Sequence, residues 1–424
     1  MITFKKSTVN FLVLALIAFI YPPIGIIFVL ATVLFSNWDQ RLYITPHYAI
    51  FFALIFAVLG YNMTTQSTDL QAYIKVVNDV SGLSLNDIFN TLFFNSKTQL
   101  YITDLFIYLA SRSGNPYILP CIVGFVNYYI IFYIFFDFRN RSKNYNKIQL
   151  LLLSILLIGV ITPVSVISNT RCVTSYVIIC FAAYREFVQH KRNAITLILY
   201  IITIWIHTSA IAFLMIRILI YMVKYIGKLS IFLALFATNI IDFLHNTLFN
   251  ISIGNNLFQL IYNAINQAYF YLHEIDPSMN AQYRADINNI FVRIYGTCFI
   301  LGLLFIIYYQ SYVNKKNPLK YEKIVEYIIM ICIFSLGTLS IPTGIFWRYE
   351  AAIIFLSPII LMRTVNSNDT LVKSISYLLM ISGAIVGLIM FTIQIMWIPP
   401  KSLVYGFVTT NGLKIGYELL KAVF

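Results

Sequence analysis

Two ionisable residues interrupt apolar sequence in the middle of this chain, and they are the first candidates for chemistry. Arg171 follows an apolar run at 148–167, and His207 breaks the apolar run that begins at Ala194. An ionisable group at membrane depth costs about 2.5–3.5 kcal/mol on insertion scales, which makes it a functional candidate by default. An arginine stays charged and can bind phosphate oxygens through two donors, whereas a histidine can take a proton from an attacking hydroxyl.

Other polar residues extend this set: Asp69, Tyr73, Arg284, Arg348 and Glu350. Two or three arginines and a histidine that face one cavity would suit a phosphate-bearing lipid substrate. Structural readings remain open beside this one. Arg171 can snorkel to lipid headgroups, and His207 can be a hydrogen-bonded packing residue. Arg348 can pair with Glu350 or Asp69 for structure alone, and Arg284 can be an ordinary loop charge.

The composition predicts an all-α, polytopic integral membrane protein. Of 424 residues, 60% are hydrophobic and only 11% are charged, and long uncharged runs recur throughout. One transmembrane domain over 1–424, with roughly 12–14 helices, accounts for these runs. The formal charge of +13 lies mainly in short loops between apolar runs, which is the positive-inside pattern and argues against nucleic acid as a partner. The five cysteines have no metal-ligand spacing and predict buried, unpaired thiols.

The basic loops also predict how the chain is threaded. They place the turn at Asn169 on the outside, together with an external loop at 62–98 that carries an amphipathic helix and a second external loop at 246–288. They further require 194–222 to cross twice as two short helices that turn near His207, whereas a single long tilted helix would conflict with the charge bias. The segment 99–112 remains open as a span, a re-entrant piece or a surface helix. Lys5-Lys6 precede an apolar stretch without a cleavage site, so a first membrane segment is expected there.

Several motifs of known chemistry are absent from the sequence. It contains no Walker A motif, no HExxH, no GxSxG and no Cys/His cluster. No acidic pair is spaced to hold a metal against a sugar diphosphate. The sequence therefore argues against ATP-driven transport and zinc proteolysis, and we expect chemistry without a metal or cofactor.

Four short motifs resemble elements of the Wzy/EpsG family of repeat-unit polysaccharide polymerases. Thr68-Asp69-Leu70-Gln71-Ala72-Tyr73 is similar to an Asp-x-x-x-Tyr element, and Asn169-Thr170-Arg171 to a segment led by arginine. Ile206-His207-Thr208-Ser209-Ala210 resembles a His-x-Ser-Ala turn, and Trp347-Arg348-Tyr349 a late arginine-containing helix. The resemblance covers about residues 40 to 365.

This resemblance implies a glycosyltransferase that makes O-antigen, capsule or exopolysaccharide at the outer side of the bacterial cytoplasmic (inner) membrane. It would move a growing glycan from undecaprenyl diphosphate to a sugar hydroxyl of an incoming lipid-linked repeat. Membrane lipids surround such an enzyme, and a chain-length regulator protein is a further expected partner.

The resemblance also suggests individual roles. Arg171 and Arg348 would hold the diphosphate, with Glu350 beside them as a further substrate-binding residue. His207 would be the general base or would orient the acceptor hydroxyl, with Asp69 as its partner or a competing base. Tyr73 and Arg284 would line the glycan path.

Two alternatives share some of these features. A glycan ligase or another lipid-linked glycan transferase would use the same chemistry with a different acceptor. A transporter or flippase would use Arg171, His207 and Arg348 to bind an anionic lipid-linked substrate during alternating access. The transporter predicts an internal two-fold repeat, which the sequence does not display.

Overall fold

The computed structural model describes ten long stretches of the chain and a few isolated positions. These are residues 48–63, 68–84, 101–142, 146–207, 209–226, 228–248, 287–313, 322–339, 345–397 and 412–423, with 16–17, 19–21, 24, 87, 262, 265–266 and 269. Within them the chain forms α-helices and one π-helical turn, and no β-strand. The all-α prediction is therefore confirmed for the described residues.

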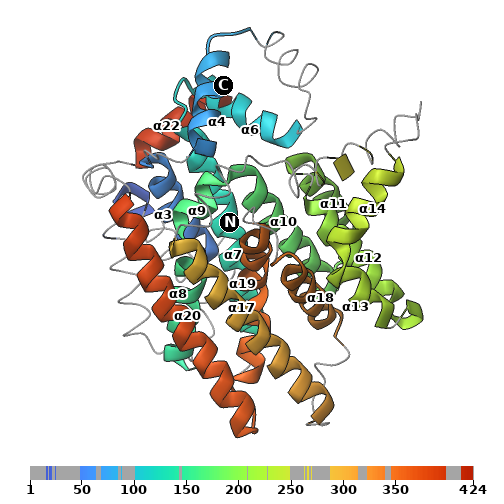
Figure 1. Cartoon of the computed structure of the whole chain (residues 1–424). Helices are drawn as coiled ribbons and strands as arrows, with labels where there is room; N and C mark the ends of the chain where they lie inside the picture. Colours follow the sequence, from blue (N-terminus) through green and yellow to red (C-terminus); the bar gives the residue numbers. More distant parts are fainter. Residues whose placement is uncertain are drawn as a thin grey trace.

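The helices form one bundle (Figure 1). In chain order they are α3 (Tyr48–Tyr61), α4 (Thr68–Val80), α6 (Tyr101–Ser113), α7 (Ile118–Arg141), α8 (Lys147–Gly159), α9 (Pro163–Ser168), α10 (Thr170–Phe187), α11 (Ala194–Ile206), α12 (Ala210–Ile226), α13 (Lys228–Leu235), α14 (Ala237–Leu248), α17 (Ile287–Tyr308), α18 (Lys323–Gly337), α19 (Ile345–Thr364), α20 (Thr370–Trp397) and α22 (Gly412–Val423). The π-helical turn, Tyr309–Val313, follows α17.

One end of the bundle, called the α6 end below, carries α4, α6 and α22 (top of Figure 1). The Thr103 hydroxyl of α6 donates to the carbonyl of Ile206, 3.4 Å away, so the C-terminal end of α11 also lies at the α6 end. The Asn115 amide donates to the Tyr61 hydroxyl at 2.9 Å and to the Glu418 carboxylate at 3.0 Å. These bonds hold the last turn of α3 and the C-terminal helix α22 beside α6.

The opposite end, called the basic end, collects the positively charged loops. The Tyr184 hydroxyl donates to Asp137 at 2.7 Å, which joins the last turns of α10 and α7. Arg363, in the last turn of α19, pairs with Glu322 just ahead of α18. The basic residues of this end are Arg139, Arg141, Arg185, Lys191, Arg192, Lys323, Arg363 and Lys373.

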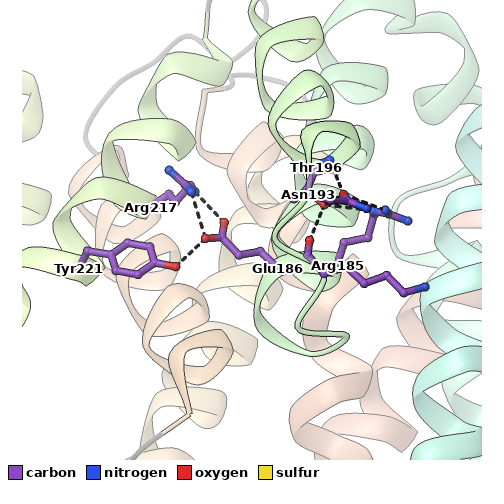
Figure 2. A network of polar contacts seen from close by, with 7 residues as sticks. Arg185, Glu186, Asn193, Thr196, Arg217 and Tyr221 are labelled. Carbon is purple, nitrogen blue, oxygen red and sulfur yellow. Dashed lines mark hydrogen bonds and ion pairs between the residues drawn. The ribbon is translucent and has the colours of Figure 1, made fainter.

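Helix α10 runs through the bundle between these ends and packs against α7, α9, α11, α12, α18 and α19. At the basic end its Glu186 is bound by Arg217 and Tyr221 of α12 (Figure 2). The Arg217 Nε and Nη2 atoms donate at 2.7 and 3.0 Å, and the Tyr221 hydroxyl donates at 2.5 Å. The predicted apolar run before α10 is not one helix, because Thr162-Pro163 ends α8 and starts the short helix α9.

The predicted helix break at His207 is confirmed. Helix α11 ends at Ile206 and α12 begins at Ala210, with His207 in extended backbone (φ −156°, ψ 127°). Segment 99–112, left open by the sequence, contributes all but the last residue of the 13-residue helix α6, which ends at Ser113. At 1.5 Å per residue α6 is about 20 Å long, the same length as α8 and α11 and shorter than the roughly 30 Å hydrocarbon layer.

Three of the described helices are long and apolar enough to cross a membrane: Ile118–Arg141, Arg293–Ser311 and Thr370–Ile393. Four apolar helices are shorter: Ala49–Tyr61, Ile148–Gly159, Ala194–Ile206 and Ala210–Met222. Glycines bring α8 and α20 close together, since a Cβ on Gly159 would lie 2.4 Å from the Cα of Gly387. The predicted first segment after Lys5-Lys6 and most of the predicted loop 246–288 lie outside the described residues. Helix α4 lies within the predicted loop 62–98.

Candidate functional site at the α6 end

Four of the residues selected from the sequence lie together at the α6 end, although they come from distant parts of the chain. Arg171 lies in the first turn of α10, Arg348 in the first turn of α19, and His207 in the turn between α11 and α12. The guanidinium carbon of Arg171 lies 5.2 Å from the ring centre of Tyr73 on α4. Both arginines are close enough to act electrostatically on the His207 imidazole.

The two arginines occupy the ends of helices that already carry positive potential. Unpaired backbone N–H groups give a helix N-terminus about half a positive charge, so acidic residues are normally favoured there. The first turns of α10 and α19 contain no acidic residue. Within the described part of the chain, Arg171 forms no ion pair with a carboxylate. The arrangement therefore concentrates positive charge, which is what an anion such as a phosphate binds.

His207 is held by a short chain of hydrogen bonds. Its side chain is buried, with 7% of the residue surface exposed. The Nδ1 atom lies 3.2 Å from the Ser209 amide nitrogen and 2.6 Å from the Ser209 hydroxyl. The Tyr176 hydroxyl of α10 donates to the Ser209 hydroxyl at 2.9 Å. Within the part of the chain that the structure describes, hydrogen bonds therefore fix the ring through Nδ1.

The charge state of His207 follows from its surroundings. The residue lies in the turn, outside both helices. Burial, followed by the positive charges of Arg348 and Arg171, lowers the pKa of its imidazole from 6.5 to about 3. The ring is therefore neutral at neutral pH.

Aromatic side chains pack against one another next to these polar groups. The Tyr176 and Tyr349 rings stack with centres 5.5 Å apart, and Phe213 packs 4.7 Å from Tyr176 and 5.2 Å from Tyr349. Sequence reasoning missed Tyr176 as a member of this site. One tyrosine among 31 carries no signal by itself; its proximity to Ser209 would have been needed to select it.

Glu350 does not join this group, although it is only two residues from Arg348. A two-residue step turns a helix by about 200°, so the two side chains leave α19 on opposite sides. Glu350 is fully buried against α17, where a Cβ on Gly296 would lie 2.4 Å from the carboxyl carbon. Neither carboxyl oxygen has a hydrogen-bond partner within the described part of the chain.

Two further predicted residues cannot be placed at the site. Asp69 belongs to the first turn of α4 by its backbone, but its side chain lies outside the described residues, and so does all of Arg284. The described residues contain no cluster of three metal-ligating side chains. The five cysteines are free thiols; Cys121, Cys172, Cys180 and Cys332 are buried, as the sequence predicts, whereas Cys298 is exposed, contrary to that prediction.

Arg171 and Arg348 bring two guanidinium groups to one end of the bundle, with a neutral imidazole within their electrostatic reach, and this combination suits a multiply charged anion. No protein-family model matches this chain, and no curated protein or solved structure matches it either. The function must therefore be inferred from the site and from the resemblance of its motifs.

Proposed function

We propose that this chain is a polytopic membrane glycosyltransferase that polymerises lipid-linked oligosaccharide repeat units. It transfers a growing glycan from undecaprenyl diphosphate to a sugar hydroxyl of an incoming lipid-linked repeat. The observation that carries the proposal is the meeting of Arg171, Arg348 and His207 from three separate helical regions at one end of the bundle.

The pattern of exposed side chains supports a membrane location. Large apolar side chains lie on the outer surface of α20, where Leu378, Ile385 and Leu388 are more than half exposed. Surface of this kind is favourable in lipid and unfavourable in water. We propose roughly 12–14 crossings for the full chain, with the bilayer locally thinned around the shorter apolar helices.

The distribution of charge supports an orientation. The basic loops lie together at the end opposite Arg171 and Arg348, and the positive-inside rule assigns such an end to the cytoplasm. The candidate site at the α6 end then faces the outside, where α4 and α6 lie near the membrane surface. A lipid-linked repeat that has already been flipped outward would meet the arginines there.

The proposed reaction needs little from the protein besides binding and charge stabilisation. A bond forms between the acceptor hydroxyl oxygen and the anomeric carbon, and the bond from that carbon to the diphosphate oxygen breaks. The electron pair leaves with the diphosphate, whose negative charge therefore grows in the transition state. Arg171 and Arg348 would stabilise that charge, and one donor aimed at a developing anion is typically worth about 10²- to 10³-fold in rate.

The test is the length distribution of the surface glycan, resolved on a gel, in a strain that lacks the gene. Complementation with wild type should restore a ladder of repeats, whereas Arg171→Ala at matched expression should give single repeats. Arg112→Ala is the matched control, because Arg112 is an exposed arginine at the same end, on α6. It should restore the ladder.

The other outcomes separate the alternatives. An unchanged ladder in the deletion strain removes the polymerase proposal and leaves a ligase or a transporter to be tested by acceptor transfer and by flipping assays. A full ladder with Arg171→Ala keeps the polymerase and removes Arg171 from its site.

A further inference from the structure

The hydrogen bond from the Ser209 amide determines which nitrogen of His207 carries the proton. A backbone N–H can only donate, and the Ser209 N–H points to Nδ1 at 3.2 Å. Nδ1 must therefore be the unprotonated nitrogen of the neutral ring, and the proton lies on Nε2.

The side-chain bonds point in the same direction. The Tyr176 hydroxyl donates to Ser209 Oγ at 2.9 Å, so the Ser209 hydrogen is free to point toward Nδ1, which lies 2.6 Å away. Tyr176, Ser209 and His207 thus form a one-way chain of donors that ends on Nδ1. The nitrogen left for a substrate is a donor.

The charges around the ring oppose the role of a base. A general base becomes a cation when it takes a proton, and this imidazole would become a third cation beside Arg171 and Arg348. Like charges in a buried site disfavour that state. A neutral donor avoids the repulsion and adds to the field of the arginines.

We propose that His207 donates its Nε2–H to the departing diphosphate, and that Ser209 and Tyr176 are positioning residues that hold it in this tautomer. The inference rests on the proposed function and replaces the predicted general base with a third donor for the leaving group. His207 keeps its own proton throughout. The proton of the acceptor hydroxyl passes to a different base, for which Asp69 is the other candidate from the sequence.

Two substitutions of His207 separate a donor from a base. A glutamine amide places an N–H near the position of Nε2 but cannot take up a proton at neutral pH. With purified enzyme and lipid-linked repeats, His207→Gln should keep the transfer rate within about tenfold of wild type, whereas His207→Ala should lose about 100-fold. If both variants are equally inactive, the donor role is overturned.

Two further substitutions test the positioning residues. Ser209→Ala and Tyr176→Phe should each lower kcat by about three- to tenfold, with little change in KM. Ser209→Thr keeps the hydroxyl and should therefore keep kcat close to that of wild type. Ser154→Ala and Tyr128→Phe are matched controls, because the Ser154 hydroxyl bonds only within its own helix and the buried Tyr128 hydroxyl has no partner within the described residues. Losses in the controls as large as in the test variants would reduce Ser209 and Tyr176 to packing residues and contradict the proposal.

A measurement without substrate separates this inference from the proposed function. Nitrogen-15 NMR of the full chain, labelled only at histidine, reports the tautomer, and His207→Gln identifies the signal by its loss. An Nε2–H signal at neutral pH supports the donor chain even in a protein that polymerises nothing. An Nδ1–H or doubly protonated ring would overturn the chain, even in an active polymerase.

Discussion

The two ends of α10 differ in how their charged side chains are paired. At the basic end, Glu186 accepts from Arg217 and Tyr221, so both signs of charge are present and compensated (Figure 2). At the α6 end, Arg171 has no carboxylate partner among the described residues and shares its surroundings with Arg348. A compensated pair fastens one helix to another, whereas a cluster of like charges is a candidate for binding an ion of the opposite sign.

The same contrast appears in the aromatic residues. At the basic end, cations gather around Tyr221: the Lys323 ammonium lies 3.6 Å from the ring centre, and the Arg217 guanidinium lies 5.6 Å from it. At the α6 end, the Arg171 guanidinium lies 5.2 Å from the ring centre of Tyr73. The basic end thus distributes its charge over a packed network of cations, a carboxylate and a tyrosine.

The largest expected effect is on turnover at the α6 end. Arg348→Ala should lower the rate of glycan transfer about 100-fold, because one donor to the growing diphosphate charge is lost. The transfer rate of Arg348→Lys should lie between those of Arg348→Ala and wild type, since an ammonium keeps the charge but not the paired donors. Thermal unfolding of the purified protein should change by only a few degrees. A large drop in the unfolding midpoint would instead give Arg348 a structural role like that of Arg217.

The next effect is on stability at the basic end. Glu186→Ala should lower the free energy of unfolding by about 2 kcal/mol, because Arg217 loses its partner. This loss of stability is smaller than for a fully buried pair, because the Arg217 side chain is 27% exposed. Chemical unfolding in detergent measures this change in free energy. The transfer rate per folded molecule should not change. Arg141→Ala is the control, since it removes an exposed pair with Asp137 that is worth about 0.5 kcal/mol or less. Lost turnover with unchanged stability in Glu186→Ala would break the contrast between the ends.

Glu350 is a third case, a buried carboxyl without an ion-pair partner among the described residues, and its contact with Gly296 is testable. Gly296→Ala should destabilise the protein by about 1–3 kcal/mol, because the new methyl overlaps the carboxyl, and Glu350→Ala in the same chain should recover most of this loss. Gly302→Ala, on the same helix, should cost less, since its methyl meets the movable Leu379 side chain.

Glu350→Gln separates a packing role from the predicted substrate-binding role. The amide keeps the shape of the carboxyl, so transfer should stay within about twofold of wild type. Loss of turnover in Glu350→Gln with unchanged stability would return Glu350 to the substrate site.

The smallest effect concerns the ring beneath Arg171. Tyr73→Leu should slow transfer about threefold, since a cation–π contact between half-buried side chains contributes about 0.5–1 kcal/mol, whereas Tyr73→Phe should keep most of the rate. Steady-state rates on the purified variants measure both. Equal losses in the two variants would mean that the phenolic hydroxyl, and not the ring face, is the important group.

Local sequence signals could predict the elements that position the site. The helix break at His207 and the collection of basic loops at one end both followed from the alternation of apolar runs and charges. The opposite directions of Arg348 and Glu350 also follow from helix geometry, because residues two apart do not share a face. The split between α8 and α9 at Thr162-Pro163 is a standard proline signal that the unbroken hydropathy of the run obscures.

Contacts between distant helices could not be predicted in this way. The bond from Tyr176 to Ser209 joins α10 to the turn before α12, across 33 positions of sequence, and neither residue type is unusual. The pairing of Gly296 with Glu350 likewise depends on which faces of α17 and α19 meet. Hydropathy selects which helices pack, but not the rotation of each helix about its own axis.

Helix α10 also fixes the distance and the relative rotation between the residues at its two ends. Arg171 and Glu186 are 15 positions apart on one continuous helix, which fixes them about 22 Å apart with a set angle between their side chains. A single residue inserted between them would turn one end by about 100° relative to the other, so either the anion cluster or the ion pair would lose its register. The number of residues between these two positions is therefore constrained by both ends of the helix at once.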